Sequence, residues 1–287
     1  MSPQQAKANA AGISLTSGDF ERFRDFFYRK TGIYFEDSKR YFVDKRIVHR
    51  IQKTDHEGFR DYFTFVRFER SGKELQQLIN AMTVNETYFF RESYQFDCMV
   101  KHTLDEIVRN KPAKVPLRIW SLPSSTGEEA YSIAIYLMEY WPGIETVDVE
   151  LYASDIDSRV LDRARRGIYN QRSVDNLPTN LLKKYFTPLS NERYQASDDL
   201  RNCVDYSNVN VIDPNDMRKH RGFDLVFCRN LLIYFDDTSR RLAAESIYDA
   251  LNPKGYLFLG HSESMSRISS LFNVVKFPNC IVYQRGA

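Results

Sequence analysis

Apolar residues recur every three or four positions between residues 16 and 84, which is the spacing of helices that bury one face. Phe20, Phe23 and Phe27 mark the buried face of the first of four such stretches. The expected helix ends are Thr16 or Ser17 before the first helix, Gly32 after it, Asp37 or Ser38 before the second, Lys53 at its end, and Ser71 with Glu74 in capping-box spacing before the fourth. The pattern predicts a small all-α domain.

The pattern changes near residue 116, where short apolar runs begin to alternate with amphipathic stretches, as is typical of an α/β fold with a parallel sheet. The predicted strands cover residues 117–122, 147–153, 209–212, 223–228, 256–259, 272–275 and 280–283, and the predicted helices cover 128–140, 157–165 and 238–251. Residues 193–196 and 203–206 predict a small inserted antiparallel hairpin. We expect a flexible tail over 1–15, a helical domain over 16–84, a linker over 85–115, and an α/β domain over 116–287 with a β-subdomain at about 187–208.

The composition is that of an ordinary globular protein, with 43% hydrophobic and 27% charged residues. Its 40 Lys and Arg residues nearly balance 38 Asp and Glu residues, so the net charge of +2 argues against a protein that is basic over its whole surface and binds nucleic acid. Four scattered cysteines without a CxxC pair predict neither a disulfide framework nor a metal site. Because no apolar run is long enough to span a membrane and the first residues lack a signal-peptide core, we expect a cytoplasmic protein without membrane insertion.

The first predicted strand-to-helix turn contains one glycine, Gly127, followed by Glu128 and Glu129. A dinucleotide site requires three glycines, and two carboxylates would repel a diphosphate at this helix start, so the turn suits a cationic group. Asp155 ends the second predicted strand, where a carboxylate can accept both hydroxyls of a ribose. A nucleoside with a positively charged tail, such as S-adenosylmethionine, therefore fits better than NAD. The alternatives are that the glutamates only complement the helix dipole and that Asp155 only caps a helix.

Five motifs occur in order along the chain and together resemble one family. They are Asn-Glu-Thr-Tyr-Phe-Phe-Arg-Glu at 85–92, Ser-Thr-Gly-Glu-Glu at 125–129, Ala-Ser-Asp-Ile-Asp at 153–157, Phe-Cys-Arg-Asn-Leu-Leu-Ile-Tyr-Phe-Asp at 227–236, and Gly-His-Ser-Glu at 260–263. Over residues 16–284 the chain closely resembles the CheR family of chemotaxis receptor methyltransferases. The resemblance implies a class I, Rossmann-like methyltransferase domain with an inserted antiparallel β-subdomain, preceded by an all-α domain. It also implies methyl transfer from S-adenosylmethionine to receptor glutamates, with S-adenosylhomocysteine as product.

The resemblance also assigns site residues, position by position. The implied cofactor-binding residues are Asn85, Thr87, Arg91, Glu129, Asp155, Asn210, Val211, Asn230 and Leu231. Arg91, near the methyl group, and Tyr234, near the substrate carboxylate, are the implied catalytic pair. A glutamate side chain is already ionised at neutral pH, so it needs no general base, and the lack of a convincing catalytic histidine or cysteine is expected.

The second predicted helix concentrates positive charge, because residues 38–53 contain six Lys and Arg residues against the single Asp44. At helical spacing, four of the cations fall in one narrow stripe: Lys39, Arg46, Arg50 and Lys53. An acidic receptor helix could dock there, which fits the family's partner, the cytoplasmic helical domain of membrane chemoreceptors. The alternative is an ordinary solvated helix face. We expect a monomeric enzyme that binds no nucleic acid.

The sequence departs from the family in two places. Leu122-Pro-Ser124 and Ala130 replace the Ala-Gly-Cys and the proline that many members carry around the first motif of the α/β domain. Pro123 also removes one amide donor from that turn. Members that bind a receptor's C-terminal pentapeptide share a glycine-rich loop in the β-subdomain, whereas residues 187–196 here contain no glycine. We therefore expect a pentapeptide-independent enzyme.

Three other functions are weighed against this interpretation. A dehydrogenase is disfavoured by the missing glycine fingerprint, and a nucleic-acid methyltransferase by the absence of an Asn/Asp-Pro-Pro-Tyr/Phe signature. A signalling adaptor that binds S-adenosylmethionine without turnover remains the alternative, against which the presence of Arg91 and Tyr234 argues.

Overall fold

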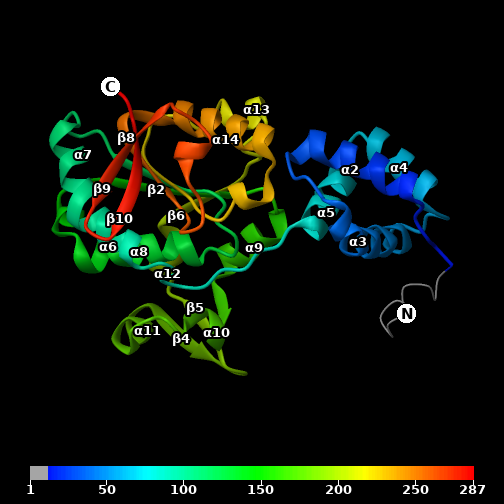
Figure 1. Ribbon diagram of the computed structural model, residues 1–287. Coiled ribbons are helices and arrows are strands. Elements are labelled where there is room, and N and C mark those ends of the chain that lie inside the picture. Colours follow the sequence, from blue (N-terminus) through cyan, green and yellow to red (C-terminus); the bar gives the residue numbers. More distant parts are fainter. Residues whose placement is uncertain (1–11) are drawn as a thin grey trace. The chain divides into compact units, whose positions relative to one another are not determined.

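The computed structural model describes residues 12–287, so most of the tail expected over residues 1–15 lies outside the described residues. The chain forms two compact units (Figure 1). The first comprises the residues up to Val84 together with Tyr234–Asp236, and the second comprises Asn85–Ile233 with Asp237–Ala287. The sequence pattern had not indicated that a segment about 150 residues beyond Val84 belongs to the helical unit.

The first unit is helical, as the apolar spacing predicts. Its elements are α2 (Ser17–Thr31), η2 (Asp37–Lys39), α3 (Arg40–Lys53), α4 (Phe59–Phe68) and α5 (Lys73–Met82). Thr16 caps α2 in a capping box with Asp19, and Gly32 ends the helix with a left-handed φ of 72°. Each helix turns its apolar stripe inward, so phenylalanines of α2 pack with aromatic residues of α4 and of the turn before η2.

The capping box expected from Ser71 and Glu74 is wrong. Gly72 stands at the N-cap of α5 and has no side chain to cap the helix, and Ser71 Oγ accepts a hydrogen bond from the Lys73 amide instead, at 3.3 Å. The Glu74 carboxylate instead accepts hydrogen bonds from Arg50 Nε at 2.9 Å and Nη2 at 2.6 Å, and from Tyr62 Oη at 2.7 Å. Glu74 is buried, and a buried carboxylate needs charged or hydrogen-bonding partners more than an exposed helix end needs a cap. This group joins α3, α4 and α5.

The Tyr234–Asp236 segment joins the first unit through its backbone and one side chain. Phe235 forms an isolated antiparallel bridge with Ile33, just beyond α2. The Tyr28 hydroxyl donates to the Asp236 carboxylate, with oxygen–oxygen distances of 2.9 and 3.1 Å. Phe235 is buried, so the segment adds to the apolar core of this unit as well as to its hydrogen bonding.

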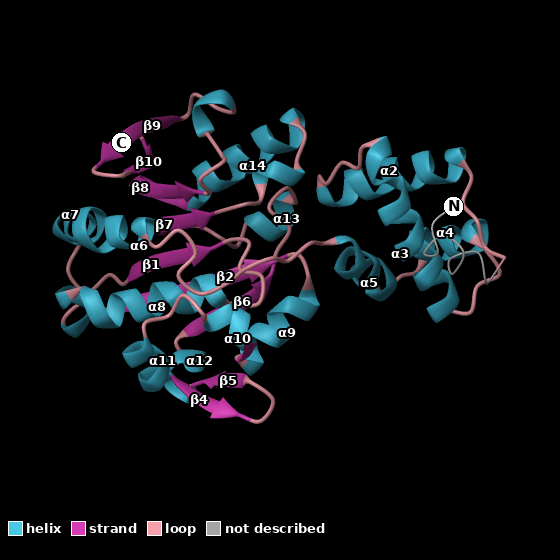
Figure 2. Cartoon of the chain, turned by 60° about the horizontal axis from the view of Figure 1, so that its bottom comes forward, coloured by secondary structure: helices cyan, strands magenta, loops and turns pink. Residues whose placement is uncertain are grey.

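The second unit is built on a seven-stranded sheet with the order β6-β2-β1-β7-β8-β10-β9 (Figure 2). The strands are β1 (Leu117–Ser121), β2 (Val149–Asp155), β6 (Val204–Asn208), β7 (Phe223–Cys228), β8 (Leu251–Leu259), β9 (Phe272–Phe277) and β10 (Cys280–Arg285). The first five pair in parallel, and β10 pairs antiparallel with both β8 and β9. β1 and β7 are buried almost throughout, as expected of central strands in a doubly wound fold. The predicted fold class is confirmed.

Helices cover both faces of this sheet, with α8 on one face and α14 on the other (Figure 2). The helical elements are α6 (Tyr94–Cys98), η3 (Met99–Thr103), α7 (Leu104–Asn110), α8 (Glu128–Tyr140), η4 (Pro142–Glu145), α9 (Ser158–Arg166), α10 (Gln171–Val174), α11 (Thr179–Tyr185), α12 (Asp198–Asn202), α13 (Pro214–Met217), η5 (Leu232–Tyr234), α14 (Asp237–Ala250) and η6 (Met265–Arg267). Among the described residues, no helix is both long and apolar enough to cross a membrane.

The predicted hairpin of 193–196 with 203–206 is wrong. Residues 204–208 form β6, the edge strand beside β2, and the predicted strand 209–212 is the loop that follows it. The small sheet instead has the order β3-β5-β4, formed by Ile168–Asn170, Arg193–Ala196 and Phe186–Leu189, so it does not occupy the expected 187–208. Only Val204 of β6 is buried, so its mostly polar sequence has the pattern of a hairpin strand, whereas buried Val209 and Val211 in the loop have the pattern of a core strand.

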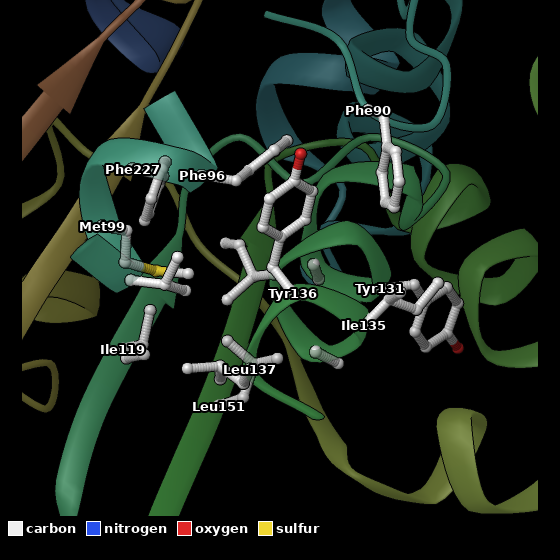
Figure 3. Packing of buried hydrophobic residues seen from close by; sticks show 14 of the residues in the cluster. Phe90, Phe96, Met99, Ile119, Tyr131, Ile135, Tyr136, Leu137, Leu151 and Phe227 are labelled. Carbon is white, nitrogen blue, oxygen red and sulfur yellow. The ribbon is translucent and has the colours of Figure 1, made fainter. Parts of the chain in front are cut away.

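Aromatic residues from the linker anchor that segment on the sheet core (Figure 3). The rings of Phe90 and Phe96 both pack against Tyr136 on α8, with centroid distances of 4.9 and 5.2 Å. Phe96 also meets Phe227 of β7 at 5.8 Å. All four side chains are buried, so the backbone between Phe90 and Phe96 is held against the strand ends where the candidate site lies.

Candidate active site

The sheet order creates a crevice at the carboxyl ends of its central strands. From β1 the chain proceeds outward through β2 to β6 on one side, and then returns to β7 and proceeds to β8 on the other. Strand order therefore reverses between the neighbours β1 and β7, and in open α/β sheets ligands bind at this reversal. The residues that follow β1, β2 and β7 are the ones that can line a site there.

Glu129, in the first turn of α8, faces this strand end and is held by two partners. Its Oε1 accepts a hydrogen bond from Ser121 Oγ at 2.7 Å, and its Oε2 accepts one from Arg229 Nη1 at 3.1 Å. Burial raises the pKa of Glu129, and the positive charge of Arg229 and the hydroxyl of Ser121 oppose that rise. A carboxylate oriented in this way can accept a further hydrogen bond from a cationic ligand group.

Glu128 has a structural task instead. Its two carboxylate oxygens accept from Thr126 Oγ1 at 2.6 Å and from Ser173 Oγ at 2.8 Å, and the side chain is buried. Burial raises the pKa of Glu128. Gly127, before it, has a φ of 94°, and a Cβ there would lie 2.7 Å from Tyr206 Oη. The turn therefore requires glycine for packing within the protein.

Asp155 ends β2 and is almost fully buried. Its Oδ2 accepts from the Ser125 amide and its Oδ1 from the Asp157 amide, both at 2.9 Å. Burial raises the pKa of Asp155 to about 6, although these amides pull it down. Asp157, not Asp155, caps α9, through a bond from the Arg159 amide. Asp157 Oδ2 also accepts from Asn85 Nδ2 at 3.0 Å, so the start of the linker is bound beside the end of β2.

Arg91 lies in a linker backbone with unusual geometry. The residues on either side, Phe90 and Glu92, both have positive φ, at 58° and 54°. The Phe90 amide donates to Ser132 Oγ on α8, which helps to hold this shape. The Arg91 side chain is half-buried and Nη1 donates to the Glu86 carbonyl at 3.0 Å. Non-glycine residues at positive φ are uncommon, and two so close together indicate a backbone shaped for its side chains.

The loop after β7 is fixed by a carboxylate from the loop that follows β8. Glu263 accepts hydrogen bonds from the amides of Asn230 at 2.7 Å, Leu232 at 2.8 Å and Gly260 at 2.9 Å. Asn230 is held in the left-handed region at φ 59°. A Cβ at Gly260 would lie 2.8 Å from Asn230 Nδ2, so the glycine leaves room for that side chain.

The remaining expected site residues lie in different places. Asn210 and Leu231 are half-buried beside the ends of β6 and β7, Val211 is buried, and Thr87 is half-buried in the linker. The side-chain oxygen of Asn210 accepts a hydrogen bond from the Ile212 amide, and this bond shapes the loop after β6. Tyr234, the expected catalytic tyrosine, is 39% exposed and belongs to the first unit, whereas the expected cofactor-binding residues belong to the second.

The basic stripe of the first unit is only partly exposed. Lys39 and Lys53 lie on the surface. Arg50 is paired with buried Glu74, and Arg46 donates from Nε to the Ala81 carbonyl at 2.7 Å. The structure therefore gives the two arginines packing roles that helical spacing alone does not distinguish from a free cationic face.

Family models match both parts of the chain. Residues 85–281 match the SAM-binding domain of CheR methyltransferases, and residues 18–83 match the all-α domain of the same enzymes. The chain belongs to the CheR methyltransferase family. It is 55% identical to Chemotaxis protein methyltransferase 2 of Vibrio cholerae over 273 residues, which cover 95% of this chain and 94% of the relative. It is 36% identical to the Chemotaxis protein methyltransferase 2 of Pseudomonas aeruginosa, with 91% of each chain covered.

The cofactor of this CheR family member is S-adenosylmethionine, and the acceptor groups present fit it. Glu129 in the first turn of α8 is bound to Ser121 at the end of β1, and Asp155 ends the adjacent strand β2, so a cationic amino group and a ribose can each find an acceptor. The buried Ser124 Oγ in the turn between them has no hydrogen-bond partner among residues 12–287. The Leu122–Pro123 peptide before this turn is cis. The Ser124 amide donates a hydrogen bond to the Ser154 carbonyl at 2.8 Å.

Sequence reasoning missed two residues in the CheR site. Arg229 and Glu263 lie within the motifs at 227–236 and 260–263, but the sequence pattern assigns neither a role. The available signal was a charged residue next to a largely apolar strand, because such a residue must be paired if it is buried. Their partners lie more than thirty positions away, at Glu129 and Asn230, so only the fold could show what they bind.

Proposed function

We propose that this protein transfers the methyl group of S-adenosylmethionine to glutamate side chains in the cytoplasmic helices of chemotaxis receptors, giving glutamate methyl esters. The family match carries the proposal, together with relatives that are named chemotaxis protein methyltransferases and aligned over nearly the whole chain. Methyl transfer and the cofactor follow from the family, and the glutamate acceptor and the receptor are the proposed part. We also propose that the enzyme acts in the cytoplasm as a monomer.

The proposed acceptor matches the chemistry of the site. S-adenosylmethionine supplies a methyl group on a sulfonium, which a carboxylate can attack directly. A glutamate with a pKa of about 4.3 is ionised at neutral pH, so the protein need not remove a proton. Its tasks are to bind, to orient and to exclude water.

The side chains proposed for these tasks come from separate elements. Glu129 and Asp155 are proposed to accept hydrogen bonds from the cofactor's amino group and ribose, and Asn230 to close the pocket after β7. Arg91 is proposed to orient the incoming carboxylate by its positive charge. Tyr234 is proposed to donate a hydrogen bond to that carboxylate, and its 39% exposure leaves the side chain accessible to a protein substrate.

Receptor docking is proposed for the exposed part of the basic helix. Lys39 and Lys53 remain solvent-exposed cations at the two ends of the stripe on η2 and α3. Arg46 and Arg50 contribute positive potential to the stripe, although Glu74 offsets the charge of Arg50. An acidic receptor helix is the complementary partner.

We further propose that docking does not use a receptor's C-terminal pentapeptide. The turn between β4 and β5 has only three residues, Ser190 to Glu192, because Leu189 pairs directly with Arg193. Asn191 and Glu192 both adopt positive φ without glycine. We expect calorimetry with such a pentapeptide to give negligible heat. Micromolar binding would contradict the prediction.

The decisive test is transfer of labelled methyl groups to a panel of receptor cytoplasmic fragments. We expect label that is released by mild base, because carboxyl methyl esters hydrolyse and N-methyl groups do not. Replacing the labelled glutamates by alanine should abolish incorporation. Cofactor binding without label transfer to any fragment would support the signalling-adaptor alternative, and base-stable label would place the methyl group on nitrogen.

A further inference from the structure

Arg229 is a buried cation in the candidate site for which the proposed reaction assigns no task. It follows β7 directly, and its side chain is only 2% exposed. Its flat side packs over the Phe96 ring, with 5.5 Å between the guanidinium carbon and the ring centroid. Arginine is rarely buried to this degree unless its charge is matched, so its partners indicate what it does.

The two terminal nitrogens of Arg229 reach three acceptors. Nη1 donates to Glu129 Oε2 at 3.1 Å, and Nη2 donates to the Arg91 carbonyl at 2.6 Å and lies 3.2 Å from Glu92 Oε2. One side chain therefore contacts both the first turn of α8 and the linker. It binds the backbone of Arg91, the residue proposed to orient the substrate.

The same contacts define a charge balance. Counted by formal charge, Glu92 and Glu129 contribute two negative charges and Arg229 one positive charge, which leaves one negative charge on the group. Glu92 is held in this group by the His261 amide at 3.1 Å and by Gln95 Nε2 at 3.1 Å. The single remaining charge suits one ammonium group, and Arg229 prevents the two carboxylates from facing each other uncompensated.

We propose that Arg229 is a positioning residue with two separable effects. By its charge, it keeps Glu129 ionised and oriented for the amino group of the cofactor. By its hydrogen bond to the Arg91 carbonyl, it holds the linker so that the Arg91 side chain projects where the methyl group is transferred. The first effect rests on the cofactor alone, and the second rests on the proposed methylation of glutamates.

Substitutions separate the two effects, measured as S-adenosylhomocysteine affinity by calorimetry and as kcat with receptor fragments. R229K keeps the positive charge, but a single ammonium group cannot bind all three acceptors at once. We therefore expect S-adenosylhomocysteine affinity within about fivefold of wild type and a kcat lower by at least about tenfold. R229M removes the charge and should weaken binding by at least about tenfold. Adding E92Q to R229M restores the net charge, so affinity should recover at least threefold while kcat stays low.

A matched control comes from the same unit. Lys111 is also a buried cation, only 10% exposed, and pairs with both oxygens of Asp224 near the opposite end of β7. K111M should lower thermal stability as R229M does, but leave affinity and kcat within about twofold. Equal effects of K111M and R229M on affinity and kcat would show that Arg229 acts only through stability, and would overturn the proposal.

The binding measurements stand even if the receptor is not the substrate, because S-adenosylhomocysteine binds without turnover. Should R229M fail to fold, E92Q alone tests the charge balance. Neutralising Glu92 leaves Glu129 and Arg229 with no net charge, so we expect about tenfold weaker binding of S-adenosylhomocysteine. Unchanged affinity in E92Q, or an equal loss of affinity and kcat in R229K, would overturn the proposal.

Discussion

Arg91 differs from the other candidate residues because its position is set by the backbone of its two neighbours and not by contacts of its own side chain. Positive φ at Phe90 and Glu92 sets the backbone, and the side chain itself has only the Glu86 carbonyl and the Tyr88 ring as described partners. A guanidinium held loosely at the end of a rigid backbone can move onto an incoming carboxylate. Its main contribution should therefore come during transfer, not during cofactor binding.

We expect R91A to lower kcat by about tenfold to a hundredfold and to weaken S-adenosylhomocysteine binding by less than about threefold. Steady-state kinetics with receptor fragments and calorimetry give the two quantities. R172A is the matched control, because Arg172 is an exposed arginine that pairs with Glu86 in the same linker. Equal losses in kcat and affinity would make Arg91 an ordinary binding residue.

Asp155 should make cofactor binding depend on pH. Burial raises its pKa from 3.8 to about 6, so in the free enzyme the carboxyl holds its proton up to about pH 6. Ribose hydroxyls donate to the ionised form, so binding must release that proton at lower pH. We expect S-adenosylhomocysteine affinity to be constant above pH 7 and about tenfold weaker at pH 5.

The raised pKa of Asp155 should also make the stability of the free enzyme depend on pH. Because the folded pKa lies above the unfolded value, ionisation of Asp155 lowers the free energy of unfolding as the pH rises from about 4 to about 6 without ligand. D155N removes the titration, so its affinity should be lower than that of wild type and nearly independent of pH. A wild-type affinity that stays constant down to pH 5 would show that Asp155 is not the ionising acceptor.

At the scale of elements, hydrophobic periodicity correctly predicted the helices and strands whose own residues are apolar enough to form the core. Helix α8 occupies the predicted 128–140, and β7 occupies the predicted 223–228, because each is apolar enough to be central. Periodicity was wrong at β6, where an edge strand and the loop after it exchange their expected patterns. Pairing between strands more than twenty residues apart in the sequence, as between Ile168 of β3 and Gln195 of β5, depends on the fold as a whole.

The buried group that joins three helices of the first unit gives a prediction about stability. E74A leaves Arg50 and Tyr62 without their shared acceptor, so we expect the free energy of unfolding to fall by about 3 kcal/mol. Urea unfolding followed by far-ultraviolet circular dichroism measures this. Cofactor affinity should change by less than about twofold, because the acceptors proposed for the cofactor lie in the second unit.

A control for E74A is available in the same unit. Asp37 pairs with Arg24 at the surface, with the aspartate side chain 89% exposed, so D37A should lower the free energy of unfolding by less than about 1 kcal/mol. A similarly small effect of E74A would mean that the Arg50 charge is available to a partner. The two variants together therefore decide whether Arg50 belongs to the core or to the docking surface.

For the whole molecule, a net charge of +2 conceals an uneven distribution, since the basic helix carries far more than its share. If exposed cations on that helix guide receptor docking, raising the salt concentration from about 50 to about 500 mM should lower kcat/KM for receptor by at least about tenfold. S-adenosylhomocysteine affinity should change by less than about twofold over the same range. A flat response of kcat/KM would exclude electrostatic docking, and K39E/K53E should reduce the salt dependence.

The Tyr234–Asp236 segment makes the helical unit discontinuous along the gene. Exchanging residues up to 84 between two relatives would separate Ile33 from its own Phe235, and Tyr28 from its own Asp236. A chimaera that is meant to redirect receptor choice should therefore carry both pieces from the same parent. Recombination at a single junction would divide the helical unit between two parents, so natural exchange of this domain between genes should require matched replacement at both places.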